Sequence, residues 1–369
     1  NSATGEIQLG TRGVGIWGAH KIDSSVSTWT KNIDITNNGK ITGIAGKKGV
    51  FGIYAVNDIA TYPTATSNIV HGTTGNIDLS QSEESVGIYM TNGTLTSSGN
   101  ISVNNKSVGL DATTSDVTVN GGTHTIGKES VGFKLTGSNS GTISKNFFGN
   151  SGNISITGED SVAYLLKNMN LTSGTNFKDD LSLSSTKSYT YINADTSRLN
   201  YRNTKVIAND DSMFINAKDS YVTLLAGTDI SSTNKDVKGI YSESGYVYNH
   251  GTLSLTGDKS AALYGKDSSI SNELSGKITV GKDGSGIYVK GNTSDGTNYG
   301  EITIGEGSVG IRAEDATITN GATGKILSIA KSATGMSQSG GNQDIINNGT
   351  IALTGDKSTA LHSEGITTA

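Results

Sequence analysis

A short phrase recurs along most of the chain, and this recurrence limits the possible folds more than any other feature of the sequence. Ser-Val-Gly stands at 85–87, 107–109, 130–132 and 308–310, and Ser-Val-Ala stands at 161–163. Alignment on the Gly position gives fourteen copies, most of them 22–25 residues apart, a period that is typical of solenoid folds. The anchor residues are Gly15, Gly52, Gly87, Gly109, Gly132, Ala163, Thr190, Phe214, Gly239, Ala262, Gly286, Gly310, Gly335 and Ala360.

The residue after each anchor is apolar or aromatic in all fourteen copies, so we expect it to point into a core. The anchor itself is Gly or Ala in twelve copies, and we expect it to face outward. Beside it should lie a second outward column that holds tyrosine in five copies. These tyrosines are Tyr54, Tyr89, Tyr241, Tyr264 and Tyr288.

Two further strands belong to most copies. One precedes the anchor, as in "GNISV" at 99–103 and "GEITI" at 300–304, and the other follows it, as in "DVTVN" at 116–120. Their alternating apolar residues indicate strands with one buried face. Asn-x-Gly segments such as "NHG" at 249–251 suit left-handed corners between strands. Three strands and three corners per copy predict an all-β, right-handed parallel β-helix (a solenoid) of about fourteen coils.

This fold predicts one rod over residues 1–369, with coils stacked at roughly 4.8 Å. Hydrophobic residues make up 33% of the chain and aromatic residues 6%, which suits a thin core along a rod. Cysteine is absent, so no disulfide framework is expected. The net charge is −5 and no basic stripe is present, so we expect no nucleic-acid partner.

The motifs of common enzymes and metal sites are weak or missing. Two GxGxxG strings, at 13–18 and 305–310, coincide with repeat anchors and precede no amphipathic helix. The adjacent acids Asp210 and Asp211, and the pair at 179–180, are expected in solvent-facing turns. No His pair has ligand spacing. We therefore expect no catalytic residues, no metal and no cofactor.

Binding residues are more plausible where the repeat is interrupted, because insertions in solenoids often lie on one binding face. Inserted loops are predicted near 18–34, 55–74 and 135–151, and irregular coils over 165–235. Exposed aromatic residues in such loops are typical anchors of an interface. The alternative is that these rings fold back as caps over the rod. The candidate binding residues are Trp17, His20, Trp29, Tyr62, Pro63, His71, Phe147 and Phe148.

The pattern resembles the passenger domains of large type V autotransporter adhesins, especially the very long ones of fusobacteria. The segments at 85–89, 300–304, 308–311 and 348–353 carry the resemblance, which covers most of the chain and is weaker over 165–235. It implies a β-helix, on the bacterial cell surface or secreted, that attaches to host-cell surface proteins or glycans, or to other bacteria. We expect the chain to be a monomer.

The resemblance further implies export through an outer-membrane barrel. The sequence opens within the repeat, at "NSATGEIQLG", so we expect a signal peptide and the barrel outside this segment. Three functions follow from the sequence. The first is an adhesin segment that displays binding loops. The second is a β-helical polysaccharide lyase or glycoside hydrolase, and the third is a passive stalk.

Overall fold

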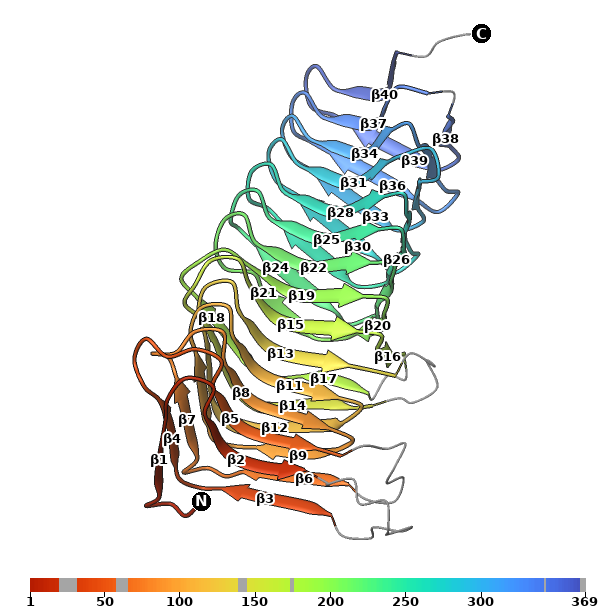
Figure 1. Ribbon diagram of the computed structural model, residues 1–369. Coiled ribbons are helices and arrows are strands. Elements are labelled where there is room, and N and C mark those ends of the chain that lie inside the picture. Colours follow the sequence, from red (N-terminus) through yellow and green to blue (C-terminus); the bar gives the residue numbers. More distant parts are fainter. Residues whose placement is uncertain (20–31, 58–65, 139–144, 173–175, 342, 366–369) are drawn as a thin grey trace. The chain divides into compact units, whose positions relative to one another are not determined.

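The computed structural model describes residues 1–19, 32–57, 66–138, 145–172, 176–341 and 343–365, and every element within them is a β-strand (Figure 1). The chain forms two compact units, unit 1 over Asn1–Tyr189 and unit 2 over Thr190–Ala369. Within each unit, parallel strands stack in register from one coil to the next, which confirms the predicted parallel β-helix. The units together make about 12 turns, slightly fewer than the fourteen coils expected. One continuous rod over 1–369 stays a prediction.

Each coil of unit 1 has three walls. The anchor wall contains β2 (Val14–Ala19), β5 (Phe51–Val56), β8 (Val86–Thr91), β11 (Val108–Thr113), β13 (Val131–Thr136) and β15 (Ser161–Lys167). The second wall contains β1 (Glu6–Leu9), β4 (Lys40–Gly43), β7 (Asn76–Leu79), β10 (Asn100–Val103) and β18 (Ser182–Ser185). The third wall contains β3 (Ile33–Asn37), β6 (Ser67–His71), β9 (Gly93–Ser97) and β17 (Phe177–Asp179). The long strands β12 (Asp116–Ile126) and β14 (Phe147–Ile156) pair with strands of both the second and third walls, and β16 (Asn170–Leu171) follows β15.

Unit 2 repeats the same three walls. Its anchor wall contains β19 (Tyr189–Asp195), β22 (Met213–Lys218), β25 (Lys238–Glu243), β28 (Ala261–Lys266), β31 (Ser285–Lys290), β34 (Val309–Glu314), β37 (Thr334–Ser339) and β40 (Thr359–Glu364). Its second wall contains β21 (Thr204–Val206), β24 (Asp229–Ser232), β27 (Thr252–Leu255), β30 (Lys277–Val280), β33 (Glu301–Ile304), β36 (Lys325–Ser328) and β39 (Thr350–Leu353). Its third wall contains β20 (Arg198–Tyr201), β23 (Tyr221–Leu224), β26 (Tyr246–Asn249), β29 (Ser269–Asn272), β32 (Asp295–Asn298), β35 (Thr317–Asn320) and β38 (Ile345–Asn347).

The apolar column after the anchor forms the core, as expected. Its members are fully buried through most coils, for example Ile88, Ile287 and Ile311, each with no exposed surface. In the outermost coils the column is less covered, and Leu361 on β40 is 49% exposed. Each member lies in register beside its equivalents in the neighbouring coils, so the column is continuous along the stack.

The anchor residue is buried in every coil except the first and the last, and the expectation that it faces outward is wrong. In β31, Gly286 and Ile287 are both buried, which breaks the strict alternation of a flat strand. A Cβ atom added to Gly286 would lie 2.6 Å from the carbonyl oxygen of Gly310 and 2.7 Å from Cγ2 of Ile302. The anchor is small because the next coil's backbone and the second wall crowd this point. The tyrosines of the adjacent column do face outward and are half-buried.

One anchor assignment is also wrong by a residue. Strand β19 pairs with β22 through Thr190 with Met213 and Ile192 with Ile215. Tyr191 is therefore the equivalent of the anchor Phe214, and Ile192 continues the core column. Both aromatic anchors are buried and stack with ring centroids 5.7 Å apart. Two rings at a position that elsewhere holds glycine or alanine explain why the repeat is hard to recognise there.

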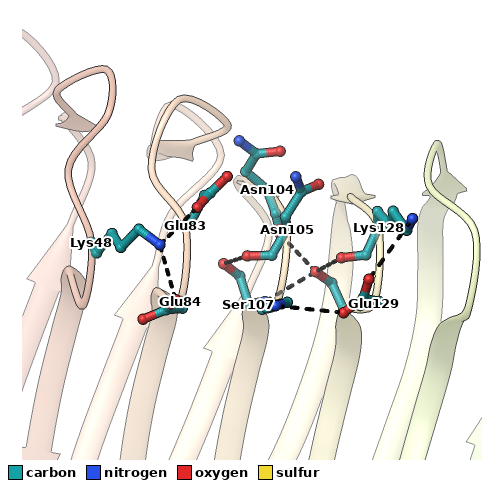
Figure 2. A network of polar contacts seen from close by, with 10 residues as sticks. Lys48, Glu83, Glu84, Asn104, Asn105, Ser107, Lys128 and Glu129 are labelled. Carbon is teal, nitrogen blue, oxygen red and sulfur yellow. Dashed lines mark hydrogen bonds and ion pairs between the residues drawn. The ribbon is translucent and has the colours of Figure 1, made fainter.

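The repeated serine of the Ser-Val-Gly phrase joins successive coils through hydrogen bonds (Figure 2). The backbone N–H of Ser85 donates to Oγ of Ser107 at 3.0 Å, and the N–H of Ser107 donates to Oγ of Ser130 at 3.0 Å. Each hydroxyl also donates within its own coil, for example from Ser107 to the carbonyl of Asn105 at 3.0 Å. Where successive coils both carry this serine, the hydroxyl of one coil thus satisfies a buried backbone N–H of the coil before it.

The residue before this serine has left-handed backbone, with φ of 53° at Glu84 and 54° at Lys106. Charged side chains at these corners project into solvent, and Lys48 pairs with both Glu83 and Glu84 at 3.1 Å (Figure 2). The left-handed residue of this corner is therefore a charged residue more often than glycine.

The Asn-x-Gly corners work differently from the expectation. Neither Asn249 nor Gly251 has positive φ. In unit 2 the corner asparagines hydrogen-bond side chain to side chain, with Nδ2-to-Oδ1 distances of 2.8–2.9 Å, and all of them except the last, Asn347, are buried. The glycine is required by close approach, since a Cβ on Gly251 would lie 2.9 Å from the carbonyl oxygen of Thr228. The members of this asparagine ladder are Asn249, Asn272, Asn298, Asn320 and Asn347.

Placing a charge in the core column should destabilise the fold strongly. We expect Ile287→Asp to lower the free energy of unfolding by about 4 kcal/mol or more, because the carboxylate would be buried without a partner. Chemical denaturation measures the loss. Thr279→Asp is the matched control, because Thr279 faces outward on β30 of the same coil. Equal stability of the two variants would contradict the burial pattern.

Candidate functional site

Four aromatic side chains gather on the outer side of the anchor wall of unit 1. They are Trp17 on β2, Phe51 and Tyr54 on β5, and Tyr89 on β8, and we call them the aromatic face. Register places Tyr54 beside both Trp17 and Tyr89. The rings of Tyr54 and Tyr89 stack with centroids 5.0 Å apart, and Phe51 meets Tyr54 edge-on at 5.5 Å. Trp17 is 73% exposed, so the face offers a large indole to solvent.

The outward column that contains Trp17, Tyr54 and Tyr89 continues into a charged pair of residues. Asp111 lies beside Tyr89 in register, and Lys134 lies beside Asp111. Lys134 Nζ approaches Asp111 Oδ2 at 2.8 Å, whereas the buried Oδ1 of Asp111 has no hydrogen-bond partner in the described structure. Burial raises the pKa of Tyr89, and the Asp111 carboxylate raises that pKa further. The aromatic face is therefore bounded on this side by a carboxylate that is buried and paired with Lys134.

The structure places only some of the predicted binding residues. Trp17 is exposed, and Phe148 points outward from β14 and is half-buried. His20, Trp29, Tyr62 and Pro63 lie outside the described residues, so their role and the capping alternative stay open.

Two predicted binding residues belong to the interior instead. Phe147 has no exposed surface and packs against Phe133 and Tyr164, at centroid distances of 5.3 Å and 5.2 Å. It begins strand β14 rather than lying in a loop. His71 also has no exposed surface. Neither side chain can contact a partner at the surface, so these two assignments are wrong.

His71 occupies a corner position equivalent to asparagine. It lies beside Asn37 in register, and the Asn37 Nδ2 amide lies 3.2 Å from its Nδ1 atom. Its Nε2 atom lies 3.1 Å from the carbonyl oxygen of Asn100. Since a carbonyl can only accept, Nε2 carries the hydrogen and Nδ1 accepts from the amide, which fixes a neutral ring. Burial lowers the pKa of His71.

A second buried histidine lies in the second-wall segment of β12. His124 stands in register between Ile101 and Ile154, so it occupies a position filled by isoleucine in both neighbouring coils. Its Nε2 atom has no hydrogen-bond partner in the part of the chain that the structure describes. Burial, followed by repulsion from His71, lowers the pKa of His124 to about 4. These histidines are structural groups that resist protonation.

The candidate carboxylates do not converge. Asp211 is exposed, has left-handed backbone and lies at the corner before Ser212, and Asp210 lies 3.8 Å from Lys235 Nζ, as expected for solvated turns. Asp179 differs from the expectation, because it is buried and accepts a hydrogen bond from the Tyr164 hydroxyl at 2.8 Å. Its neighbour Asp180 is exposed. The pair thus faces opposite sides of a wall, which does not fit an acid–base pair around one substrate.

Within the described ranges, no group of three His, Asp or Glu residues could hold a metal ion. None of the described residues forms a helix that is long and apolar enough to cross a membrane.

The sequence interpretation missed a second outward column on the third wall of unit 2. Arg198, Tyr221 and Tyr246 lie in register on β20, β23 and β26. The signal was present, because alignment of the third-wall segments "RLNY", "YVTL" and "YVYN" places these residues in one column.

The comparisons with known proteins found no match to this chain, neither to a protein-family model nor to a curated protein.

The two buried histidines predict acid sensitivity. The pKa of His124 is about 4 in the folded chain and about 6.5 when unfolded, so the unfolded state binds more protons between these values. The histidine's contribution is fully present above about pH 6.5 and is lost as pH falls towards 4, by about 3 kcal/mol. Urea denaturation across this range measures the slope.

We expect His124→Ile to reduce this slope, because Ile101 and Ile154 show that the site accommodates isoleucine. His71 contributes to the slope that remains. His362→Asn is the control, since His362 is exposed on β40. An unchanged slope in His124→Ile would contradict the assignment.

Proposed function

We propose that the chain is a segment of a bacterial cell-surface adhesin, in which the β-helix carries binding surfaces for a host-cell or bacterial receptor. The receptor is a protein or a glycan. The aromatic face of unit 1 is the observation that carries this proposal. A cluster of half-buried rings beside a tryptophan that is 73% exposed is a typical feature of an interaction site.

The position of the aromatic face supports the proposal further. Trp17 and Tyr54 lie on β2 and β5, the strands that precede the two largest interruptions of the repeat. Rigid strands hold the rings, because Tyr54 is fixed between Tyr89 and Phe51. A preorganised surface loses little side-chain entropy on binding, which favours affinity.

The regularity of the remaining coils argues for the same location. The corners of successive coils repeat similar residues, so a ligand that contacts only the corners finds few differences from coil to coil. The aromatic face is confined to part of unit 1, because the same outward column holds Asp111 and Lys134 in the next two coils. The aromatic face is therefore a better candidate for specific recognition than the repeated corners.

We expect Trp17→Ala to weaken binding about thirtyfold, which corresponds to about 2 kcal/mol for a ring anchor. The melting temperature should stay unchanged, because the indole is largely exposed. Binding of the labelled protein to cultured host cells, bacterial cells and a glycan array measures the effect. Tyr299→Ala is the matched control, since Tyr299 is 42% exposed on unit 2.

If Trp17→Ala binds like the parent protein, the aromatic face is not the binding surface. If the parent protein binds to no cell and no glycan, the passive stalk becomes the better interpretation. The same assay applies to Trp29→Ala and Tyr62→Ala, for which we also expect weaker binding at an unchanged melting temperature. A lower melting temperature in these two variants would favour the capping alternative.

The enzyme alternative predicts turnover of polysaccharides. We expect release of reducing ends from uronic-acid and neutral polysaccharides to stay at background, because the candidate carboxylates do not face one another. Turnover that is lost in Asp210→Asn or Asp211→Asn would overturn this expectation and would favour a lyase or hydrolase.

A further inference from the structure

A hollow on unit 2 lies at the end of a stack of planar side chains. The outward column on the third wall runs through Arg198, Tyr221, Tyr246, Ser269 and Asp295 on successive coils. Parallel in-register strands bring these side chains one above another, at the spacing between strands. The column is therefore a stack in which each side chain covers its neighbour.

In the first part of this stack, the planar side chains cover one another's faces. The guanidinium carbon of Arg198 lies 4.8 Å from the ring centroid of Tyr221. The rings of Tyr221 and Tyr246 are nearly parallel, at 12°, with centroids 4.7 Å apart. One face of Tyr246 is thus covered by Tyr221, and one face of Tyr221 is covered by a cation.

The other face of Tyr246 has no planar neighbour. The next residue in the column is Ser269, which is too small to cover a ring, and Tyr246 is 41% exposed. A hollow of about 330 Å³ opens at this point, and its lining includes Tyr246, Ser269, Asp267, Asp295, Thr293 and Ser244. This volume is at the lower end of the range for small-ligand sites.

Two carboxylates give the hollow a negative charge. Thr293 Oγ1 donates to Asp267 Oδ1 at 3.3 Å, and Ser269 Oγ donates to Asp295 Oδ2 at 2.9 Å. These bonds orient the carboxylates without neutralising them. The lining contains no Lys or Arg, and neither carboxylate is ion-paired within the described chain. A cation would therefore gain from both charges.

We propose that this hollow binds the guanidinium group of an arginine side chain from a partner protein. A guanidinium is planar and cationic, so it stacks on an aromatic face and donates in-plane hydrogen bonds to carboxylates. Arg198 already makes the stacking contact at the opposite end of the tyrosine pair. The partner's arginine would repeat that contact on Tyr246 and would add hydrogen bonds to Asp267 and Asp295.

A neutral sugar ring fits the hollow less well. It could stack on Tyr246, but it would leave both carboxylate charges without a cation. An anionic ligand would be repelled. The site lies on unit 2, away from the aromatic face of unit 1 in sequence, and it does not depend on the adhesive role proposed there.

The test uses the full 369-residue chain and three blocked tripeptides, acetyl-Gly-X-Gly-amide with X as arginine, citrulline or lysine. Citrulline keeps the planar shape of arginine and removes its charge. NMR of ring-labelled tyrosine follows binding at Tyr246. We expect the arginine peptide to bind weakly, on the order of 1 mM, and the citrulline peptide at least about tenfold more weakly. The lysine peptide should lie between them.

Three variants locate the binding. We expect Tyr246→Leu, Asp267→Asn and Asp295→Asn each to weaken binding of the arginine peptide about tenfold. Tyr248→Leu is the matched control, because Tyr248 faces outward on the same strand and does not line the hollow. It should bind like the parent protein. Thermal melting of every variant checks that the fold is retained, and the two conservative Asn variants decide the outcome if Tyr246→Leu is destabilised.

Equal binding of the arginine and citrulline peptides would overturn the proposal, as would retained binding in both Asn variants. Tighter binding of methyl glucoside than of the arginine peptide would identify a sugar site instead. Absence of any shift at Tyr246 with the arginine peptide would exclude a guanidinium site. None of these results bears on the cell-binding assay of the aromatic face, so the two proposals fail independently.

Discussion

The parallel backbone ladder between successive coils is the constraint on which the rest of the structure depends. It holds each side chain against its equivalent one coil away, so a residue can be buried only if its equivalents tolerate the same surroundings. The serine and asparagine corners show this directly. Ser107 accepts from the coil before it and donates to the coil after it, and Asn298 does the same with its side-chain amide. The sequence repeats because these hydrogen bonds repeat.

The same constraint explains where the repeat fails. A large ring at the anchor position needs more space than glycine does. The neighbouring coil must provide that space. Tyr191 and Phe214 occupy successive anchors and stack on one another, while Phe133 and Tyr164 stack in the core column of unit 1. Lys205 stands where neighbouring coils have isoleucine or leucine, with its Nζ atom 5.6 Å from the ring centroid of Tyr191. Irregular residues therefore come in compensating groups.

The outward columns are less constrained, and there the ladder creates surfaces. Repetition of an aromatic residue at one outward position produces a rigid stack, as for Tyr54 with Tyr89 and for Tyr221 with Tyr246. A stack becomes available to a ligand only where it ends. In unit 1 the column changes from Tyr89 to Asp111, and in unit 2 it changes from Tyr246 to Ser269. Both candidate sites follow from a change of residue type within an otherwise regular column.

The sequence by itself determined the fold class, the three strands of each coil and the apolar core column, because a period of 22–25 residues and its alternating pattern admit few other solutions. Only the tertiary structure decided the direction of the anchor, since the burial of Gly286 depends on Gly310 and Ile302 in other strands. It also decided that His71 and Phe147 are interior. Their place in the predicted insertions suggested exposure, but they lie in register beside Asn37 and Phe177 and are buried. The structure also decided which carboxylates line the hollow beside Tyr246. This depends on contacts between coils, and the sequence of a single repeat does not specify them.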